Sequence, residues 1–560
     1  MQLRDSNIRR LADETFDVLI IGGGINGASA AAALAGKGVR VALIDRGDFA
    51  GATSQHSSNL AWGGIKYLES HDFGLVRKLC KSRNHLIESF PSTVQEIRFL
   101  TTVGRGFRHR PHTLWAGAWL YWLMGNGATR IPHYLRPSSI RRREPIVDVS
   151  EAVGGLEYSD AYLHDNDARF VFNFVRSALD HGGCAANYVA SEGARRSGDG
   201  WLTRVRDEIG GESFEVRSQV LINAAGPWVD AHNALTGQAT EHRHAYSKGI
   251  HLIVPRLTDH HRVLAFFADD GRLFFAIPMG PRTCIGTTDT PVDSPEVSVT
   301  DDDVAFVLDN INKRLSLATP LTRDDVISTR CGVRPLAVKA SGGEGRDFLQ
   351  LSRKHAIDTD EKHRHISIFG GKLTDCLNVG EEIVTEVERL GIAPSHPDAR
   401  WYGEPGDDVK RDFLRQAERM GLDDLTPVSS SEPLTTRLWR RYGRHAFELL
   451  ERIRQDPRQG ELLIEGTEYL RGELEQARQR EMVTRLEDFL RRRSKISLVV
   501  GEAPLRASPG LREACEILFG DRAEERLADY FAGATDDEAA PASADTTVDA
   551  THDSASRASA

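Results

Sequence analysis

The hydrophobic positions near the N-terminus follow two different periods. Residues 16–21 form a short apolar run rich in β-forming residues, glycines at 22–24 interrupt it, and an alanine-rich stretch continues to residue 34. A second apolar run, at 39–44, ends at Asp45. This pattern predicts a strand, a tight turn, a helix and a second strand, which together make a βαβ unit at the start of the chain.

Beyond the βαβ unit, the hydrophobic pattern predicts first further strands and then, after residue 405, helices. Four further apolar runs predict strands that we expect to form a substrate-facing sheet. They lie at residues 220–224, 251–254, 273–278 and 284–288. After residue 405 the sequence is charge-rich with apolar residues at helical spacing, which predicts a separate helical domain.

Composition narrows the classes of function. The 560 residues exceed what one hydrophobic core accommodates, so two or three domains are expected. The net charge of -10 argues against nucleic acid as the main partner. The six cysteines form no zinc-type cluster, so we expect no metal site and read them as reduced thiols of a cytoplasmic protein.

The turn after the first strand carries a recognisable motif. Residues 22–27, GGGING, fit G-x-G-x-x-G between a predicted strand and helix, and Asp45 follows about 20 residues later. Gly22 permits the turn, Gly24 lets backbone amides approach a pyrophosphate, and Gly27 lets the helix pack against the strand. A carboxylate at position 45 disfavours a 2′-phosphate, so NADP is not expected, but the motif alone does not separate NAD from FAD.

Longer segments carry a family resemblance in the same order along the chain. Among them are DRGDFAGATSQHSSNLAWGGIKYLE from residue 45, LINAAGPWVD, KGIHLIVP, GTTDT, GVRPL and FGGKLT. Over residues 15–395 the sequence resembles the FAD-dependent glycerol-3-phosphate dehydrogenase family, of the aerobic, quinone-linked type. Residues 473–495 are similar to its C-terminal domain, more faintly.

The resemblance implies an α/β fold: a Rossmann-like FAD-binding domain, a mixed or antiparallel-sheet substrate domain as in D-amino-acid-oxidase-like flavoproteins, and an α-helical C-terminal domain. The expected domains are 15–100 with 150–232 and 348–395 for FAD, 101–149 with 233–347 for the substrate and a membrane-facing surface, 400–532 for the helical domain, and 533–560 for a disordered acidic tail.

Residue by residue, the resemblance also implies a site. The residues expected to contact FAD are Gly22, Gly24, Asn26, Gly27, Asp45, Thr53, Ser54, Ser57, Ser58, Val189, Ala225, Gly226, Gly371, Lys372, Leu373 and Thr374. The substrate phosphate would be bound by Lys66, Tyr67, Arg334 and Lys372. His251, with Arg334 and Lys372, forms the expected catalytic group, in which neutral imidazole suits a general base.

The activity implied is oxidation of sn-glycerol 3-phosphate to dihydroxyacetone phosphate, with hydride transfer to flavin N5 and electrons passed to a membrane quinone. Oxygen remains an alternative electron acceptor, and the protein could form a homodimer. Lys66, Ala61 with Trp62, and residues 375–378 depart from the family pattern. Two alternatives therefore remain: another polyol phosphate or a hydroxy or amino acid as substrate, and a flavin-binding protein without turnover.

Residues 114–123, LWAGAWLYWL, are too short to span a bilayer. Three tryptophans within the segment suit an interfacial helix, and a buried core helix is the alternative. Basic residues flank it at Arg108, Arg110, Arg130 and Arg136. We therefore expect a cytoplasmic protein that associates peripherally with the inner face of the cell membrane.

Overall fold

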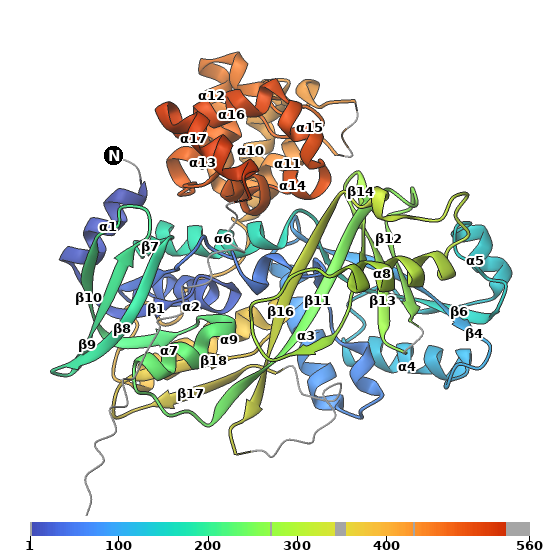
Figure 1. The fold of residues 1–560 in the computed structure, drawn as a ribbon, viewed down its shortest axis with the longest axis horizontal. Coiled ribbons are helices and arrows are strands. Elements are labelled where there is room, and N and C mark those ends of the chain that lie inside the picture. The colour runs from blue at the N-terminus through green and yellow to red at the C-terminus, as the bar shows by residue number, and fades with distance from the viewer. Residues whose placement is uncertain (1–2, 269–270, 342–353, 429, 431, 534–560) are drawn as a thin grey trace, which may run out of the picture.

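The computed structural model describes residues 3–268, 271–341, 354–428, 430 and 432–533 (Figure 1). This part of the chain contains two large sheets and a helical C-terminal region that lies across one side of both. The expected acidic tail lies outside the described residues, as does part of the third FAD-binding segment.

The first sheet has a parallel core in the order β18-β10-β1-β2-β7. Its strands are β1 (Thr15–Ile21), β2 (Val41–Ile44), β7 (Cys184–Ala186), β8 (Val189–Ser197), β9 (Gly200–Asp207), β10 (Ser213–Asn223), β17 (Ala356–Asp360) and β18 (His365–Phe369). Strand β1 pairs in parallel with β2, so the predicted βαβ unit is present. The run expected at 220–224 belongs to β10 and pairs with β1, so its assignment to the substrate-facing sheet was wrong. A buried apolar run does not reveal its partner strand, because pairing is a long-range contact.

Helix α2 (Ile25–Gly36) packs against the first sheet between α6 (Asp167–Asp180) and α9 (Cys376–Arg389). Its alanines are buried, and their small side chains allow the three helices to lie close together. On β1, Val18 and Ile20 face this helical layer, whereas Leu19 and Ile21 pack in the core on the other face, beside α1 (Leu3–Asp13). The near-continuous apolar run in β1 thus reflects a strand buried on both faces.

The second sheet is mixed and follows the order β15-β11-β14-β13-β12-β4-β6-β3, with β16 beside β11 and β5 beside β6. Its strands are β3 (Leu60–Ala61), β4 (Val94–Gly104), β5 (His133–Leu135), β6 (Ala152–Leu163), β11 (His242–Pro255), β12 (Arg262–Phe267), β13 (Leu273–Met279), β14 (Arg282–Gly286), β15 (Thr290–Val292) and β16 (Ser328–Lys339). The expected domain boundaries at residues 100 and 150 need correction, because β4 and β6 belong to this sheet. Sequence order does not determine sheet membership when a chain crosses between two sheets.

Four further helices lie in sequence between strands of the second sheet. They are α3 (Phe73–Ser89), α4 (Pro111–Met124), α5 (Pro137–Arg143) and α8 (Asp301–Arg314), and a short α7 (Val229–Leu235) follows β10. The helical C-terminal region contains α10 (Asp407–Arg419), α11 (Leu434–Tyr442), α12 (Ala446–Gln455), α13 (Arg471–Arg480), α14 (Ile496–Val499), α15 (Glu502–Ala507), α16 (Pro509–Phe519) and α17 (Ala523–Phe531). The expected fold class is therefore confirmed.

Candidate active site

The turn between β1 and α2 is built almost entirely from close backbone contacts. Gly22 has φ +104°, and a Cβ there would lie 2.4 Å from the carbonyl oxygen of Ala224. A Cβ on Gly27 would lie 1.9 Å from the carbonyl oxygen of Gly22. Only glycine fits at these two positions, and the first turn of α2 is consequently brought against the end of β1.

Asp45 follows β2 directly and braces this turn. Its carboxylate accepts N–H bonds from Gly23 at 2.6 Å and from Gly47 at 2.9 Å. Burial raises the pKa of Asp45 to about 6, and the two backbone bonds oppose that shift. Each carboxylate oxygen keeps a second lone pair, so the side chain can still accept a ribose hydroxyl.

Residues 53–58 lie against this turn through the 3₁₀ turn Thr53–Gln55. The Ser54 hydroxyl accepts the N–H of Ile25 at 3.0 Å, and Thr53 Oγ1 donates to the carbonyl of Val333 on β16 at 2.7 Å. Ser57 donates to Asp167 through both its N–H and its hydroxyl, at 2.9 and 2.8 Å. The serine-rich segment thus connects the first sheet, α6 and the second sheet.

Three other predicted cofactor contacts come from distant parts of the chain. Val189 is fully buried, and its N–H donates to the Asp45 carbonyl at 2.7 Å. Ala225 and Gly226 follow β10, and the Cα of Ala225 lies 2.8 Å from where a Cβ on Gly22 would stand. The structure therefore brings these residues to the β1–α2 turn.

Residues 370–374 return to the same turn between β18 and α9. The side-chain amide of Asn26 donates to the Gly370 carbonyl at 2.9 Å, and a Cβ on Gly371 would lie 3.2 Å from Asn26 Oδ1. Gly371 has φ +105°. Leu373 and Thr374 form the short turn that precedes α9.

Residues 22–27, 53–54 and 370–374 together form a glycine cradle that fits a dinucleotide. A Cβ on Gly24 would meet the Ser54 hydroxyl at 3.3 Å, so the bare glycine backbone is what leaves room at the start of α2. The buried Oδ1 of Asn26 has no hydrogen-bond partner among the described residues. A helix N-terminus with exposed N–H groups and small side chains is the arrangement that binds a pyrophosphate.

His251 lies on β11 and is 1% exposed. Its Nε2 is 2.8 Å from the Ser58 hydroxyl, and its Nδ1 is buried with no hydrogen-bond partner in the described part of the chain. Burial, and then the charges of Arg330 and Arg334, lower the pKa of His251 well below its usual value. The imidazole is therefore neutral at neutral pH and able to accept a proton.

The Arg334 guanidinium lies over Gly249, two residues before His251 on the same face of β11. A Cβ on Gly249 would lie 2.3 Å from Arg334 Nη2, so this glycine makes the space for the guanidinium. Arg334 donates to Thr287 Oγ1 at 2.8 Å and to the Thr288 carbonyl at 3.1 Å. Arg334 and His251 thus form one pair of site groups.

Lys372 forms a second group with aromatic residues. Its ammonium nitrogen lies 4.3 Å from the ring centroid of Tyr67 and 5.8 Å from that of Trp62. Lys66 precedes Tyr67 in the short turn Ile65–Leu68 and is partly buried. Ser58, which bonds to His251, and Trp62 and Tyr67, which contact Lys372, belong to one stretch of chain. This stretch therefore links Lys372 to His251.

Sequence reasoning missed several residues that hold these groups in place. Asp167 binds Ser57, and Arg330 donates to the Ser57 carbonyl and to Asn59 Oδ1 at 2.5 and 2.7 Å. Asp167 lies in residues 156–183, a segment that also carries the resemblance, but was not assigned to the site, and Arg330 lies outside the resembling segments. Gly249 and Thr287 lie inside the KGIH and GTTDT segments that carry the resemblance, and their role could have been sought there.

Residues 375–378, which depart from the family pattern, form a polar network. Asp375 lies 2.9 Å from His355 Nδ1 and accepts from Ser82 at 2.9 Å and from Asn378 at 2.5 Å. Burial acts to lower the pKa of His355, but the carboxylates of Asp375 and Glu382 raise it to about 9. The protonated imidazole therefore ties the start of α9 to the segment before β17.

Comparisons with known proteins agree with this geometry. Residues 17–358 match the FAD dependent oxidoreductase family, and residues 410–524 match the C-terminal domain of alpha-glycerophosphate oxidase. The chain is 33% identical to glycerol-3-phosphate dehydrogenase 2 of Mycobacterium tuberculosis over 525 residues, which covers 91% of this chain and 85% of that protein. It is 31% identical to glycerol-3-phosphate dehydrogenase of Pseudomonas aeruginosa over 505 residues, covering 87% and 92%.

A solved structure shows the same fold. The glycerol-3-phosphate dehydrogenase of Bacillus halodurans, complexed with FAD, superposes with a TM-score of 0.71 at 24% identity, and the match covers 95% of this chain and 96% of that one. Together with the glycine cradle, these matches identify the cofactor as FAD. The chain belongs to the family of FAD-dependent glycerol-3-phosphate dehydrogenases.

Proposed function

We propose that this enzyme oxidises sn-glycerol 3-phosphate to dihydroxyacetone phosphate. The observation that supports this most directly is the placement of neutral His251 beside the Arg334 guanidinium, on a strand linked through Ser58 to the cofactor segment. The relatives named glycerol-3-phosphate dehydrogenase support the same substrate.

The cationic side chains suit a phosphate group. Arg334 offers a planar fork of donors, whereas Lys66 and Lys372 offer point charges that hold a phosphate with less geometric definition. The Thr287 and Thr288 bonds fix the guanidinium, so it does not need to reorder when substrate binds.

Bound FAD supplies the hydride acceptor for this reaction. In this proposal His251 accepts the hydroxyl proton while the C–H bond breaks and the C=O bond forms. It requires the tautomer in which Nε2–H donates to the Ser58 hydroxyl, because Nδ1 is then the nitrogen with a free lone pair for the proton.

An anaerobic titration tests the proposal. Glycerol 3-phosphate added to the purified yellow protein should bleach the oxidised flavin band within seconds, with one substrate consumed per flavin. Dithionite should bleach the same sample, which shows that the flavin is reducible. A flavin that dithionite reduces and glycerol 3-phosphate does not would overturn the substrate assignment.

Another polyol phosphate is the competing candidate substrate. The observation that favours it is the polar network around Asp375, because this network includes residues that depart from the family pattern. Asp375 and Asn378 stand at positions where the family pattern differs, and Asp375 bonds to His355, to Asn378 and through its N–H to the Lys372 carbonyl. Other phosphorylated polyols, and hydroxy or amino acids, belong in the same titration, and a non-catalytic flavin protein would be bleached by none of them.

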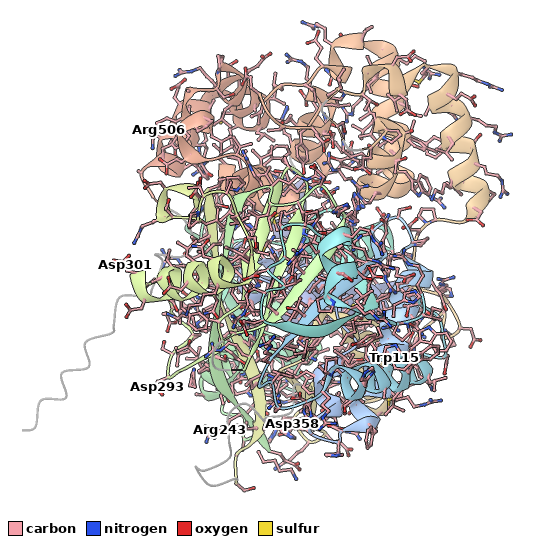
Figure 2. The ribbon with its side chains drawn as sticks, turned by 90° about the vertical axis from the view of Figure 1, so that its right-hand side faces the viewer. Trp115, Arg243, Asp293, Asp301, Asp358 and Arg506 are labelled. Carbon is pink, nitrogen blue, oxygen red and sulfur yellow. The ribbon has the colours of Figure 1, made fainter. Side chains whose placement is uncertain are left out.

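We also propose that electrons pass to a membrane quinone and that α4 rests on the inner face of the membrane. Among the described residues no helix has the length and apolarity to cross a bilayer. Leu120 and Leu123 on α4 are 41% and 59% exposed, and exposed arginines flank the helix at Arg108 and Arg130. Figure 2 shows Trp115 of this helix on the side of the molecule away from Arg506 of the C-terminal helices. These two arginines pair with Glu69 and Glu96, and exposed apolar side chains flanked by arginines suit an anionic lipid surface.

Stopped-flow reoxidation separates the acceptors. The reduced protein, mixed with a short-chain quinone in the absence of oxygen, should regain its flavin absorbance much faster than when it is mixed with air-saturated buffer. Reoxidation by oxygen at an equal or greater rate would favour an oxidase.

A further inference from the structure

The C-terminal helical region inserts a single π-helical turn, Asp488–Arg493, into the FAD-binding domain. This turn buries three consecutive arginines, Arg491, Arg492 and Arg493, which are 6%, 0% and 2% exposed. The Asn166 side chain at the start of α6 donates to the Arg491 carbonyl at 2.9 Å and to the Ser494 carbonyl at 2.5 Å. The turn is therefore held by a part of the chain more than 300 residues away.

Two of the arginines bind Asp48. Arg492 Nε and both terminal nitrogens of Arg493 donate to its carboxylate at 2.7 to 2.8 Å, and all three side chains are fully buried. Asp48 begins the tight turn that packs on the dinucleotide-binding turn. A Cβ on Gly23 would lie 2.5 Å from the Phe49 ring, and the Ala50 N–H donates to the Gly23 carbonyl at 3.0 Å.

Arg491 reaches further along the same segment. Its Nη2 donates to the Gln55 carbonyl, within the 3₁₀ turn that carries Thr53 and Ser54. In the described part of the chain, Nη1 of Arg491, Nη2 of Arg330 and Nδ1 of His56 are buried without hydrogen-bond partners. Burial, and then the charge of Arg330, lower the pKa of Arg491 to about 9, which leaves it protonated at neutral pH.

The three arginines differ in what compensates their charge. Arg492 and Arg493 each donate to buried aspartates, Asp48 and Asp488 in the first case and Asp48 in the second. Arg491 has a backbone carbonyl as its hydrogen-bond acceptor and stands near a second arginine, and the charges of Asp167 and Glu487 offset part of the cost of burying it. Since its acceptor is a carbonyl and not a carboxylate, an anionic group beside the cofactor segment would stabilise this buried cation further.

We propose that the turn Asp488–Arg493 is a cofactor-positioning element, through which the C-terminal region holds residues 48–58 in the conformation that binds FAD. Arg492 and Arg493 fix the Asp48 end of this segment, and Arg491 fixes its Gln55 end. Arg491 also adds positive charge beside residues that face the anionic dinucleotide. By linkage, docking of the C-terminal region strengthens FAD binding, and FAD strengthens docking to the same degree.

The first test replaces Arg491 by Met and measures FAD affinity by titrating the apoprotein. Loss of one hydrogen bond from a charged donor should weaken FAD binding about tenfold or more. Arg437→Met is the matched control, because Arg437 is also buried in the C-terminal region and, among the described residues, donates to Ser430 and pairs with Glu468 of that same region. Its FAD affinity should stay within about twofold of the unchanged protein.

Arg491→Lys sharpens the result. Lysine keeps the charge and can reach a carbonyl, so it should recover part of the lost affinity, whereas a purely space-filling role would make Lys no better than Met. If Arg491→Met binds FAD as tightly as the unchanged protein, the proposal is wrong.

Hydrogen exchange on the unchanged protein gives a test that does not depend on a variant folding. Adding FAD to the apoprotein should slow amide exchange at residues 488–494 as well as at 22–27. Slower exchange at 22–27 with no change at 488–494 would overturn the coupling. Neither measurement involves the substrate, so failure of this inference and failure of the proposed activity are distinguishable.

Discussion

The β1–α2 turn and the β11–β16 pair hold the two halves of the site by different means. At the turn, Gly22 and Gly27 leave no space for a side chain, and the binding groups are backbone amides. On β11 and β16 the proposed binding groups are side chains, the buried His251 and the partly exposed Arg334, and Gly249 supplies the space for the Arg334 guanidinium. Glycine thus has opposite purposes in the two regions: it brings backbone close in one and admits a guanidinium in the other.

The difference predicts different responses to substitution. Backbone packing against backbone cannot relax, so adding a methyl group at the turn should damage the fold and the cofactor site together. Removing a side chain from β11 or β16 should damage turnover while the cofactor stays bound. Substitutions at Gly27, His251 and Arg334 test this contrast, and smaller effects are expected for membrane binding by α4 and for the pH dependence of flavin reduction.

Gly27→Ala should have the largest effect. Its Cβ would stand 1.9 Å from a backbone oxygen, so we expect loss of most bound FAD and a destabilisation of about 3 kcal/mol or more. Flavin content per protein and thermal unfolding measure this. Gly117→Ala on α4, where a Cβ meets nothing within 4 Å, is the control and should change stability by about 1 kcal/mol at most.

His251→Gln should keep FAD and lose turnover. Without a proton acceptor, the rate of flavin reduction by substrate should fall about a hundredfold or more. Rapid-mixing absorbance measures this rate. His232→Gln removes another buried histidine, bonded to Ser191 on β8, and should leave the rate unchanged. An unaltered rate in His251→Gln would remove this residue from the mechanism.

Arg334→Met should lower kcat/KM about a hundredfold, because the phosphate loses its forked donor. Steady-state kinetics should show most of the change in KM if Arg334 contributes binding equally in the ground and transition states. The matched control is Lys248→Met on β11, the strand that pairs with the strand of Arg334, where the ammonium pairs with Asp303 at 2.6 Å. That variant should lose stability but keep KM, and equal KM losses in both would argue against a specific role for Arg334.

The double change Leu120→Ser and Leu123→Ser should weaken binding to anionic vesicles about tenfold, since two exposed apolar side chains on α4 are lost. Co-sedimentation measures this. Leu235→Ser removes a leucine that is 61% exposed elsewhere and should have no effect. Equal vesicle binding by all three proteins would contradict a membrane role for α4.

The smallest expected effect is that of pH on flavin reduction at saturating substrate. The pKa of His251 is lowered, so the imidazole stays neutral as the pH falls through the usual histidine range near 6.5. The rate should change less than about twofold between pH 8 and pH 6.5 and fall only at lower pH. A loss centred near 6.5 would show that the ring titrates as an exposed histidine does.

The two regions also differ in how far sequence predicts them. The β1–α2 turn was predicted residue by residue, because its contacts lie within a few positions and depend on the absence of side chains. Thr53 and Ser54 were assigned to the cofactor from the resemblance; Ser54 bonds to the first residue of α2, and Thr53 bonds to Val333 on β16. Their roles in binding remain predictions.

Strand partners were less predictable. The run at 220–224 was assigned to the wrong sheet, the expected boundary at residue 100 split β4, and β6 was assigned to the FAD-binding domain, because apolar strands look alike whichever sheet they join. Asp167, Arg330 and Arg491 were not expected at the site at all. Asp167 and Arg330 stand in a helix and a strand, and Arg491 is one of three consecutive arginines; for each, only its neighbours in space show what it binds.

The sequence by itself determined the dinucleotide-binding turn, the helical C-terminal region and the family, since each depends on local periodicity or on contiguous motifs. The tertiary structure alone decided which sheet each strand joined and which charges were buried together. It placed Arg334 over Gly249 and Arg491 beside Gln55, contacts that join residues 85 and 436 positions apart. Such contacts form only when the chain is folded, because burial and pairing of charge are properties of the packed interior.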